Sequence, residues 1–385
     1  MRIDRLLVHR VSLPFSGDVS HSRRKGACAD NVVVELVADQ DRVHGYGEGA
    51  PRPYVTGESQ ESAAEAVADL TETHSFPWEL DDASQIWGFV DSLPVTSEHN
   101  SAICAVEMAL LDALGRRHQK SIVDYFCKVF YTSAVHYGAT IPLWDVQRIK
   151  EVCHLAERMR ISQLRVKMGK GFEQNREAIE TVRQALGQDC DLRIDSNGAW
   201  DRRLAIQHVP LIAENHVRVV EQPMMPGDPD IAEFWEVMRP HGVILMADES
   251  VCSLEDLERI VKSGFYRMVN VRLSKCGGFR KSLNMIGELR ARGVSFQVGC
   301  QLGESGLLSA AGRALSLLCS DAAYYDGSYD KFMLRENITC EDVSFGPGGV
   351  AGPLDGPGLG VTVNRESLMR LGSGSPSHTV SSPTS

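Results

Sequence analysis

The sequence lacks any long apolar run. No segment approaches the roughly 20 consecutive apolar residues that a membrane-spanning helix needs. The first residues, Met1-Arg2-Ile3-Asp4, carry early charges, and neither the apolar core nor the cleavage site of a signal peptide follows them. We therefore expect a cytoplasmic protein with no membrane partner.

Cysteine pairs and basic runs are missing as well. The ten cysteines are scattered singly, without a Cys-x-x-Cys pair or a spaced Cys/His set, so the sequence predicts neither a zinc site nor a disulfide framework. The net charge of −11, with no basic run, argues against a nucleic-acid-binding surface. With 385 residues, the chain is long enough for one large domain and a smaller one.

What the sequence does contain is a recurring strand that ends in an acid. The segments "LRIDSNG", "VRVVEQP" and "VILMADES" each run from apolar residues into a carboxylate, at Asp195, Glu221 and Asp248. These acids are 26 and 27 residues apart, which leaves room for one strand, one helix and two short loops each time. This spacing predicts a series of βα units.

The units predict an α/β fold with a TIM-like barrel that follows an N-terminal α+β part. The α+β part is expected over residues 1–125, the barrel over 130–335, a C-terminal segment over 336–372 and a disordered Ser/Pro/Thr-rich tail over 373–385. The expected barrel strands are 135–140, 163–167, 191–195, 217–221, 243–248, 268–273, 295–299 and 322–326.

In such a barrel the three acids converge at the C-terminal ends of consecutive strands. Each acid alone could simply cap the helix that follows it. Three hard oxygen ligands in register, with no His or Cys, instead favour Mg²⁺, with Mn²⁺ as an alternative.

One strand earlier, "QLRVKMG" places Arg165 and Lys167 on the same side, because alternate residues of a strand face the same way. If Leu164 and Val166 face the helices, the two basic side chains point into the barrel mouth. A lysine beside a divalent cation in a poorly solvated pocket is a usable base, so Lys167 is the candidate catalytic base; the alternative is an exposed loop lysine.

The segments "RVKMG", "RIDSNG", "VVEQP", "MADES" and "VRLSKCGG" resemble the enolase superfamily, specifically the muconate lactonizing enzyme subgroup of the mandelate racemase/muconate lactonizing enzyme family. "GYGEGAPRPYVTGE" and "GPGLGV" resemble that family's capping domain, so the resemblance implies a (β/α)7β TIM-like barrel with an N-terminal α+β capping domain that the C-terminal segment 336–372 completes. The resemblance implies a carboxylate substrate bound to Mg²⁺ on Asp195, Glu221 and Asp248, whose α-proton is removed to give an enolate. It also implies supporting roles for Asn197 and Glu249 beside these ligands.

The chain departs from the family's pattern at two positions where the family carries lysine. Arg165 stands for the first lysine of Lys-x-Lys, and Arg272 stands where the second catalytic lysine is expected. Lys167, Arg165 and Arg272 are candidate catalytic residues, and Lys275, close to Arg272, is either a fourth candidate or a loop lysine. Arginine is a poor base, so the departures favour cycloisomerisation or syn-elimination of water with Lys167 as the single base.

Three alternatives stay open. The protein could be an epimerase or racemase of a dipeptide or N-acyl amino acid, a non-catalytic carboxylate-binding descendant of the family, or a Schiff-base aldolase that uses Lys167. Dipeptides are disfavoured because the family's dipeptide epimerases carry Asp-x-Asp at strand eight, where this chain reads Asp326-Gly327-Ser328.

Specificity is expected from the capping loops 16–30 and 51–58. Candidate substrate contacts there are His21, Arg23, Arg24 and Tyr54, and Glu304, after the seventh strand, is a candidate contact or acid. We expect a small-molecule carboxylate as partner and a homo-oligomeric assembly.

Overall fold

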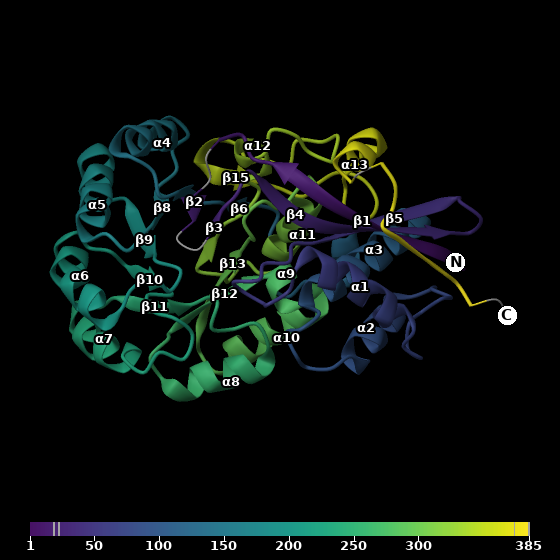
Figure 1. Ribbon diagram of the computed structural model, residues 1–385, viewed down its shortest axis with the longest axis horizontal. Coiled ribbons are helices and arrows are strands. Elements are labelled where there is room, and N and C mark those ends of the chain that lie inside the picture. Colours follow the sequence, from purple (N-terminus) through teal and green to yellow (C-terminus); the bar gives the residue numbers. More distant parts are fainter. Residues whose placement is uncertain (18–19, 22–23, 373, 384–385) are drawn as a thin grey trace.

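The computed structural model of the protein describes residues 1–17, 20–21, 24–372 and 374–383, with the backbone alone for residues 20, 21, 24 and 25. Two units lie side by side (Figure 1): an antiparallel sheet with helices α1 to α3, and a ring of parallel strands surrounded by helices α4 to α8 and α10. Within the described chain, no helix combines the length and apolarity that crossing a membrane requires.

The elements follow the chain from the capping unit through the barrel and back. The strands are β1 (Ile3–Pro14), β2 (Ser20–His21), β3 (Arg24–Lys25), β4 (Cys28–Ala38), β5 (Val43–Gly49), β6 (Val135–His136), β7 (Ala139–Ile141), β8 (Gln163–Lys167), β9 (Asp191–Asp195), β10 (Val219–Glu221), β11 (Ile244–Ala247), β12 (Met268–Arg272), β13 (Ser295–Gly299), β14 (Tyr324–Tyr325), β15 (Val350–Ala351) and β16 (His378–Ser381). The helices are α1 (Gln60–Thr71), α2 (Ala83–Ser92), α3 (Asn100–His118), α4 (Val146–Arg158), α5 (Phe172–Leu186), α6 (Arg202–Glu214), α7 (Ile231–Met238), α8 (Leu254–Ser263), α9 (Leu273–Cys276), α10 (Gly278–Ala291), α11 (Gly306–Leu317), α12 (Asp330–Met333) and α13 (Arg365–Leu371).

The capping unit is held together by close packing of β5 against α3. Gly45, Gly47 and Gly49 alternate along β5 and so face the same side of the sheet. A Cβ atom on Gly47 would lie 1.9 Å from the carbonyl oxygen of Ala105 in α3, so only glycine permits this approach. The facing stripe of α3 is correspondingly small, with Ser101, Ala105, Ala109 and Ala113 four residues apart.

The C-terminal segment does not match the predicted disordered tail. His378–Ser381 forms β16, which pairs antiparallel with the edge of β1, where Leu6 lies opposite Val380. Ser377 begins this pairing, because its backbone N–H and its hydroxyl both donate to the carbonyl of Val8. The prediction rested on composition, whereas the unpaired backbone groups of an edge strand accept any segment that can extend beside them.

The parallel strands form one sheet in the order β14-β13-β12-β11-β10-β9-β8-β7, which confirms the predicted barrel architecture. Strands β8, β9 and β13 occupy the predicted residues. In the register of β8, β9 and β10, Lys167 pairs with Asp195 and Asp195 with Glu221. These three residues therefore end their strands at the same level of the barrel.

A buried carboxylate in the capping unit predicts how the protein responds to acid. Burial raises the pKa of Glu35, but contacts with His9, Arg365, His44 and Tyr46 outweigh burial and lower it to about 2. The folded pKa lies below the unfolded value of about 4.5, so this stabilisation is present above pH 4.5 and is lost as the pH falls toward 2.

We expect Glu35→Gln to lower the free energy of unfolding by about 2 kcal/mol at pH 7 and by clearly less at pH 3. Urea titrations at the two pH values measure this difference. The exposed variant Glu61→Gln serves as the control. An equal deficit at both pH values contradicts the electrostatic explanation.

Candidate metal and acid–base site

Three carboxylates are buried together at the ends of consecutive strands. Asp195 ends β9, Glu221 ends β10 and Asp248 follows β11, and all three are completely buried. The chain turns sharply after Asp195 because Asn197 takes a left-handed backbone conformation with φ of 49°, which asparagine tolerates. This turn lets the Asn197 N–H donate to Asp195 Oδ1 at 2.9 Å, so the carboxylate is held at the strand end.

Strand β8 supplies two basic side chains to this cluster, as its alternation predicts. Lys167 Nζ donates to Asp195 Oδ2 at 2.5 Å and to Asn197 Oδ1 at 3.0 Å. Arg165 donates to Glu221 Oε2 at 2.9 Å. Arg165 and Arg272 outweigh the effect of burial on Glu221 and hold the pKa of its carboxyl well below the usual value.

The opposite side of the cluster is formed by β12 and the turn of helix after it. Arg272 hydrogen bonds to Asp248 Oδ2, lies 3.5 Å from Glu221 Oε1 and donates to Gln301 Oε1 at 2.9 Å. Since β12 is four strands from β8 in an eight-stranded barrel, Arg272 and Lys167 face each other across the barrel mouth.

Lys275, which the sequence left open as a catalytic candidate or a loop lysine, is neither in a loop nor exposed to the pocket. It lies in α9, is completely buried, and donates to the carbonyl of Asp248 at 2.7 Å, to Asp248 Oδ1 at 3.0 Å and to the carbonyl of Asn270 at 2.6 Å. Burial lowers the pKa of Lys275. The side chain is thus fixed behind Asp248 and holds that carboxylate in place, and it is not among the residues that line the pocket.

Asn197 and Glu249 connect the two sides. Asn197 Nδ2 donates to Glu249 Oε1 at 3.0 Å while its oxygen accepts from Lys167. Burial and the neighbouring Asp195 raise the pKa of Glu249. Both residues were expected to support the ligands, and both contact the cluster in the structure.

A divalent cation is the group that this donor set would hold. As the side chains stand, no three His, Cys, Asp or Glu residues in the described ranges are arranged to hold an ion, and the cluster's carboxylates contact basic groups instead. The donor chemistry nevertheless fits Mg²⁺ or Mn²⁺, because every donor is a hard oxygen atom and Glu249 Oε2 and Asn270 Oδ1 are buried without a hydrogen-bond partner.

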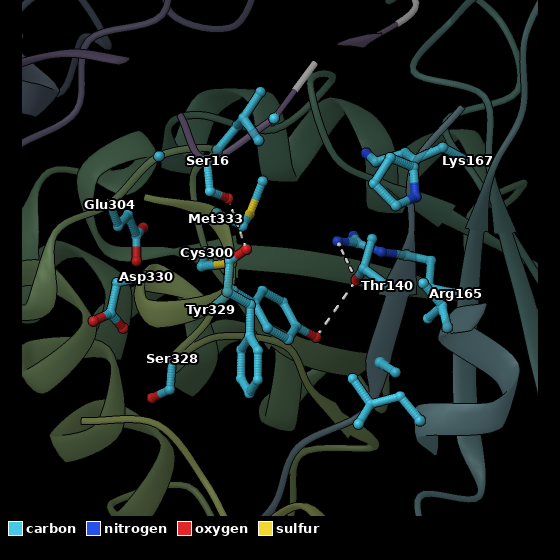
Figure 2. Close-up of a pocket in the computed structure, with 18 of the residues that line it drawn as sticks. Ser16, Thr140, Arg165, Lys167, Cys300, Glu304, Ser328, Tyr329, Asp330 and Met333 are labelled. Carbon is cyan, nitrogen blue, oxygen red and sulfur yellow. Dashed lines mark hydrogen bonds between the residues drawn. The ribbon is translucent and has the colours of Figure 1, made fainter. Parts of the chain in front are cut away.

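The cluster opens into a pocket of about 510 Å³. Lys167, Arg165, Arg272, Tyr54 and Glu304 all line it, so the structure brings these predicted residues together. In the view of Figure 2, Glu304 and Lys167 lie on opposite sides of the pocket. Burial and the neighbouring Glu48 raise the pKa of Glu304 to about 8, although its carboxylate accepts the backbone N–H of Gln301.

The other candidates from the capping loops are not placed. Arg23 and the side chains of His21 and Arg24 lie outside the residues that the structure describes, so their roles as substrate contacts stay predictions. The backbone of His21 pairs with that of Arg24 in the hairpin β2–β3.

Sequence reasoning missed a buried ion-pair network below the carboxylates. Asp326, just after β14, pairs with Arg193 at 2.9 Å and with Arg165 at 3.3 Å. All three residues are buried. A signal was available, because the alternation that brings Asp195 inward also brings Arg193 inward two residues earlier.

Active sites of βα-barrel enzymes lie at the C-terminal ends of the strands, where this cluster of acids and bases lies, and the comparisons with known proteins give the family. Residues 147–367 match the family described as "Enolase C-terminal domain-like". Residues 16–126 match "Mandelate racemase / muconate lactonizing enzyme, N-terminal domain". The chain belongs to the mandelate racemase/muconate lactonizing enzyme family.

Three relatives illustrate the range of the family. Muconate cycloisomerase 1 of Rhodococcus opacus is 28% identical over 88% of this chain and 90% of its own length. The crystal structure of N-succinyl Arg/Lys racemase from Bacillus cereus superimposes with a TM-score of 0.84 at 21% identity, covering 99% of each chain.

A dipeptide epimerase from Enterococcus faecalis, crystallised with Mg and the dipeptide L-Leu-L-Tyr, superimposes with a TM-score of 0.81 at 22% identity. The alignment covers 94% of this chain and all of that one. The two structural matches establish the shared fold.

Proposed function

We propose that this protein is an enzyme that removes the α-proton of a carboxylate substrate with Lys167 as the base. The single observation that carries the proposal is the opposition of Lys167 and Arg272, which line one pocket and each contact a buried carboxylate of the cluster behind it. A neutral lysine can take a proton, whereas arginine stays charged and can hold an anion.

We propose Mg²⁺, or Mn²⁺ in its place, as the cofactor. Asp195, Glu221 and Asp248 would hold it, with Asn197 and Glu249 as their neighbours. A divalent cation bound there would supply positive charge that stabilises a substrate carboxylate as it becomes an enolate. The crystal structure of the Enterococcus faecalis relative, described as complexed with Mg, supports this cofactor.

The chain's own residues do the rest of the chemistry. Lys167 takes the proton, and Asn197 Oδ1 together with Asp195 keeps its amine pointed at one side of the pocket. Arg272 provides a fixed positive charge from the opposite side, and Gln301 holds the orientation of its guanidinium.

The substrate we propose is an N-acyl amino acid. Relatives named as a racemase of N-succinylated amino acids and as an epimerase of dipeptides support an amino-acid derivative more than a muconate-like acid. A free dipeptide would bring an ammonium group, but Asp326 is already paired with Arg193 and Arg165. An acylated nitrogen carries no charge and needs no such partner.

Epimerisation is therefore the first candidate reaction. It requires a proton donor on the face opposite Lys167, and Glu304 is the candidate because its raised pKa keeps the carboxyl protonated near neutral pH. Lys167 takes one proton from Cα on one face and Glu304 adds one on the other, so the product has the same number of protons as the substrate. Arg272 in place of lysine favours the second candidate, a cycloisomerisation or syn-elimination in which Lys167 works alone on one face.

Deuterium exchange separates these readings. With Mg²⁺ in D₂O, epimerisation yields both configurations with deuterium at Cα, and a one-face reaction yields retained configuration or loss of water. Borohydride trapping of a Lys167 adduct with substrate would instead support an aldolase. Binding without any exchange would support a non-catalytic descendant.

The raised pKa of Glu304 predicts a limb in the pH profile. The neutral, proton-donating form dominates below pH 8, so kcat/KM for inversion should fall as the pH rises through about 8. We expect Glu304→Gln to lose inversion and this limb, while Glu65→Gln, on an exposed face of α1, keeps both. If the fall in rate near pH 8 persists in Glu304→Gln, another group causes it.

A further inference from the structure

The wall of the barrel is incomplete between its first and last strands. In the described chain no strand ladder joins β7 and β14, which form the two ends of the eight-stranded sheet. Gly138, just before β7, donates a backbone hydrogen bond to the carbonyl of Tyr325 at 3.0 Å. β14 ends at Tyr325, whereas β7 runs on from Ala139 to Ile141 without a strand partner on that side among the described residues.

Apolar side chains from both sides of this gap line the same pocket as Lys167. One face of the pocket is formed by residues of α4 that are three or four positions apart and by the residue that follows the helix. The segment after β14 forms the other face. The pocket-lining residues of the two faces are Val152, Leu155 and Met159 on one side and Phe332, Met333 and Phe345 on the other.

Two of these apolar side chains are exposed. Leu155 is 37% exposed and Phe332 is 44% exposed, and both lie on the lining of this pocket. A pocket lined mainly by apolar side chains with a few polar groups is typical of a site that binds an organic ligand. Phe332 is held in position by its ring contact with Phe345, at 5.6 Å between centroids.

A polar neck separates the apolar end from the charged end. Thr140 accepts from Arg165 at 3.4 Å and donates to the Tyr329 hydroxyl at 3.4 Å (Figure 2). Tyr329 in turn donates to the carbonyl of Gly138 at 2.7 Å. The pocket thus offers charge, then hydroxyl groups, then apolar surface, which is the order of carboxylate, amide and alkyl chain in an N-acyl amino acid.

We propose that this apolar end, here called the side channel, binds an acyl chain of six or more carbons, so that the substrate is an N-acyl amino acid with a long apolar acyl group. This inference rests on the proposed function, which supplies the N-acyl amino acid part of the substrate. The volume of about 510 Å³ lies within the range of pockets that enclose whole organic ligands, and is larger than a short carboxylate needs.

The test is a chain-length series. N-acetyl-, N-hexanoyl- and N-decanoyl-L-alanine are titrated into the full-length protein with Mg²⁺, and heat release gives each dissociation constant. Each methylene that enters the side channel should tighten binding about fourfold. Equal dissociation constants for the acetyl and decanoyl compounds would overturn the proposal.

Variants on α4 test whether the acyl chain of the ligand binds in the side channel. Leu155→Asp charges the rim of the side channel and Val152→Trp fills it, and both should abolish the dependence on chain length. His154→Asp adds the same charge to the neighbouring residue of the helix, whose side chain is 83% exposed, and should keep the dependence. If affinity depends on acyl-chain length in all three variants as it does in the wild-type protein, the acyl chain binds elsewhere and the side-channel proposal is wrong.

α-Proton exchange on the same compounds separates this inference from the proposed function. Length-dependent binding without exchange leaves the side channel standing and removes the enzymatic proposal. Exchange that occurs without any dependence of binding on acyl-chain length supports the enzymatic proposal and contradicts the side channel. Circular dichroism confirms that each variant is folded, so that lost binding reports the channel.

Discussion

Replacing Lys167 by alanine should reduce α-proton exchange by at least about a hundredfold, the smaller contribution expected of a general base. Lys167 is the one lysine that lines the pocket of the described structure, and its amine contacts Asp195 and Asn197. Exchange is measured by NMR in D₂O with saturating Mg²⁺ and an N-acyl amino acid.

Two further variants show whether the loss is chemical. Lys167→Arg keeps a positive charge beside Asp195 but cannot act as a base, so it should be as inactive as the alanine variant. Lys170→Ala removes an exposed lysine three residues along the chain and should exchange at the normal rate. Exchange that survives in Lys167→Arg would show that the lysine acts through its charge alone.

Replacing Asp248 by asparagine should weaken binding of a divalent cation by more than about a hundredfold. Changes to the neighbours of metal ligands already cost about ten- to a hundredfold in affinity, and Asp248 is a proposed ligand itself. Mn²⁺ binding followed by electron paramagnetic resonance measures the affinity without any substrate.

The variant also leaves two buried cations, Arg272 and Lys275, without their carboxylate. We therefore expect a lower melting temperature as well, and the affinity is measured well below it. Glu255→Gln, at an exposed position in α8, should change neither quantity. Unchanged Mn²⁺ affinity in Asp248→Asn would remove this residue from the metal site.

The barrel could be predicted because its signal is local and repeated. The runs that end at Lys167 and Asp195 contain continuous apolar or alternating residues bounded by polar turns, and both strands occupy the expected residues. Convergence of the three acids then follows from the geometry of parallel strands, without knowledge of any long-range contact.

Features that depend on distant contacts could not be predicted in this way. The helical turn α9 places Lys275 behind Asp248, and nothing in "LSKCGG" distinguishes that turn from a loop. Strand β16 forms because β1 offers an edge some 370 residues away in the chain. Asp326 forms ion pairs with Arg193 and Arg165, which lie in two other strands.

The side channel depends on distant contacts too. Leu155 and Phe332 are far apart in the sequence, and each alone reads as a surface apolar residue. The fold nevertheless brings both to the lining of one pocket.

Removal of an α-proton by Lys167, above a metal-binding carboxylate cluster, is tested most directly by deuterium incorporation at Cα. N-acyl amino acids, dipeptides, sugar acids and lactones are incubated in D₂O with Mg²⁺, and the wild-type protein is compared with Lys167→Ala. We expect at least one N-acyl amino acid to exchange, and Lys167→Ala and removal of the metal each to abolish the exchange. Exchange that continues in Lys167→Ala, or no exchange with any compound, would contradict this role of Lys167.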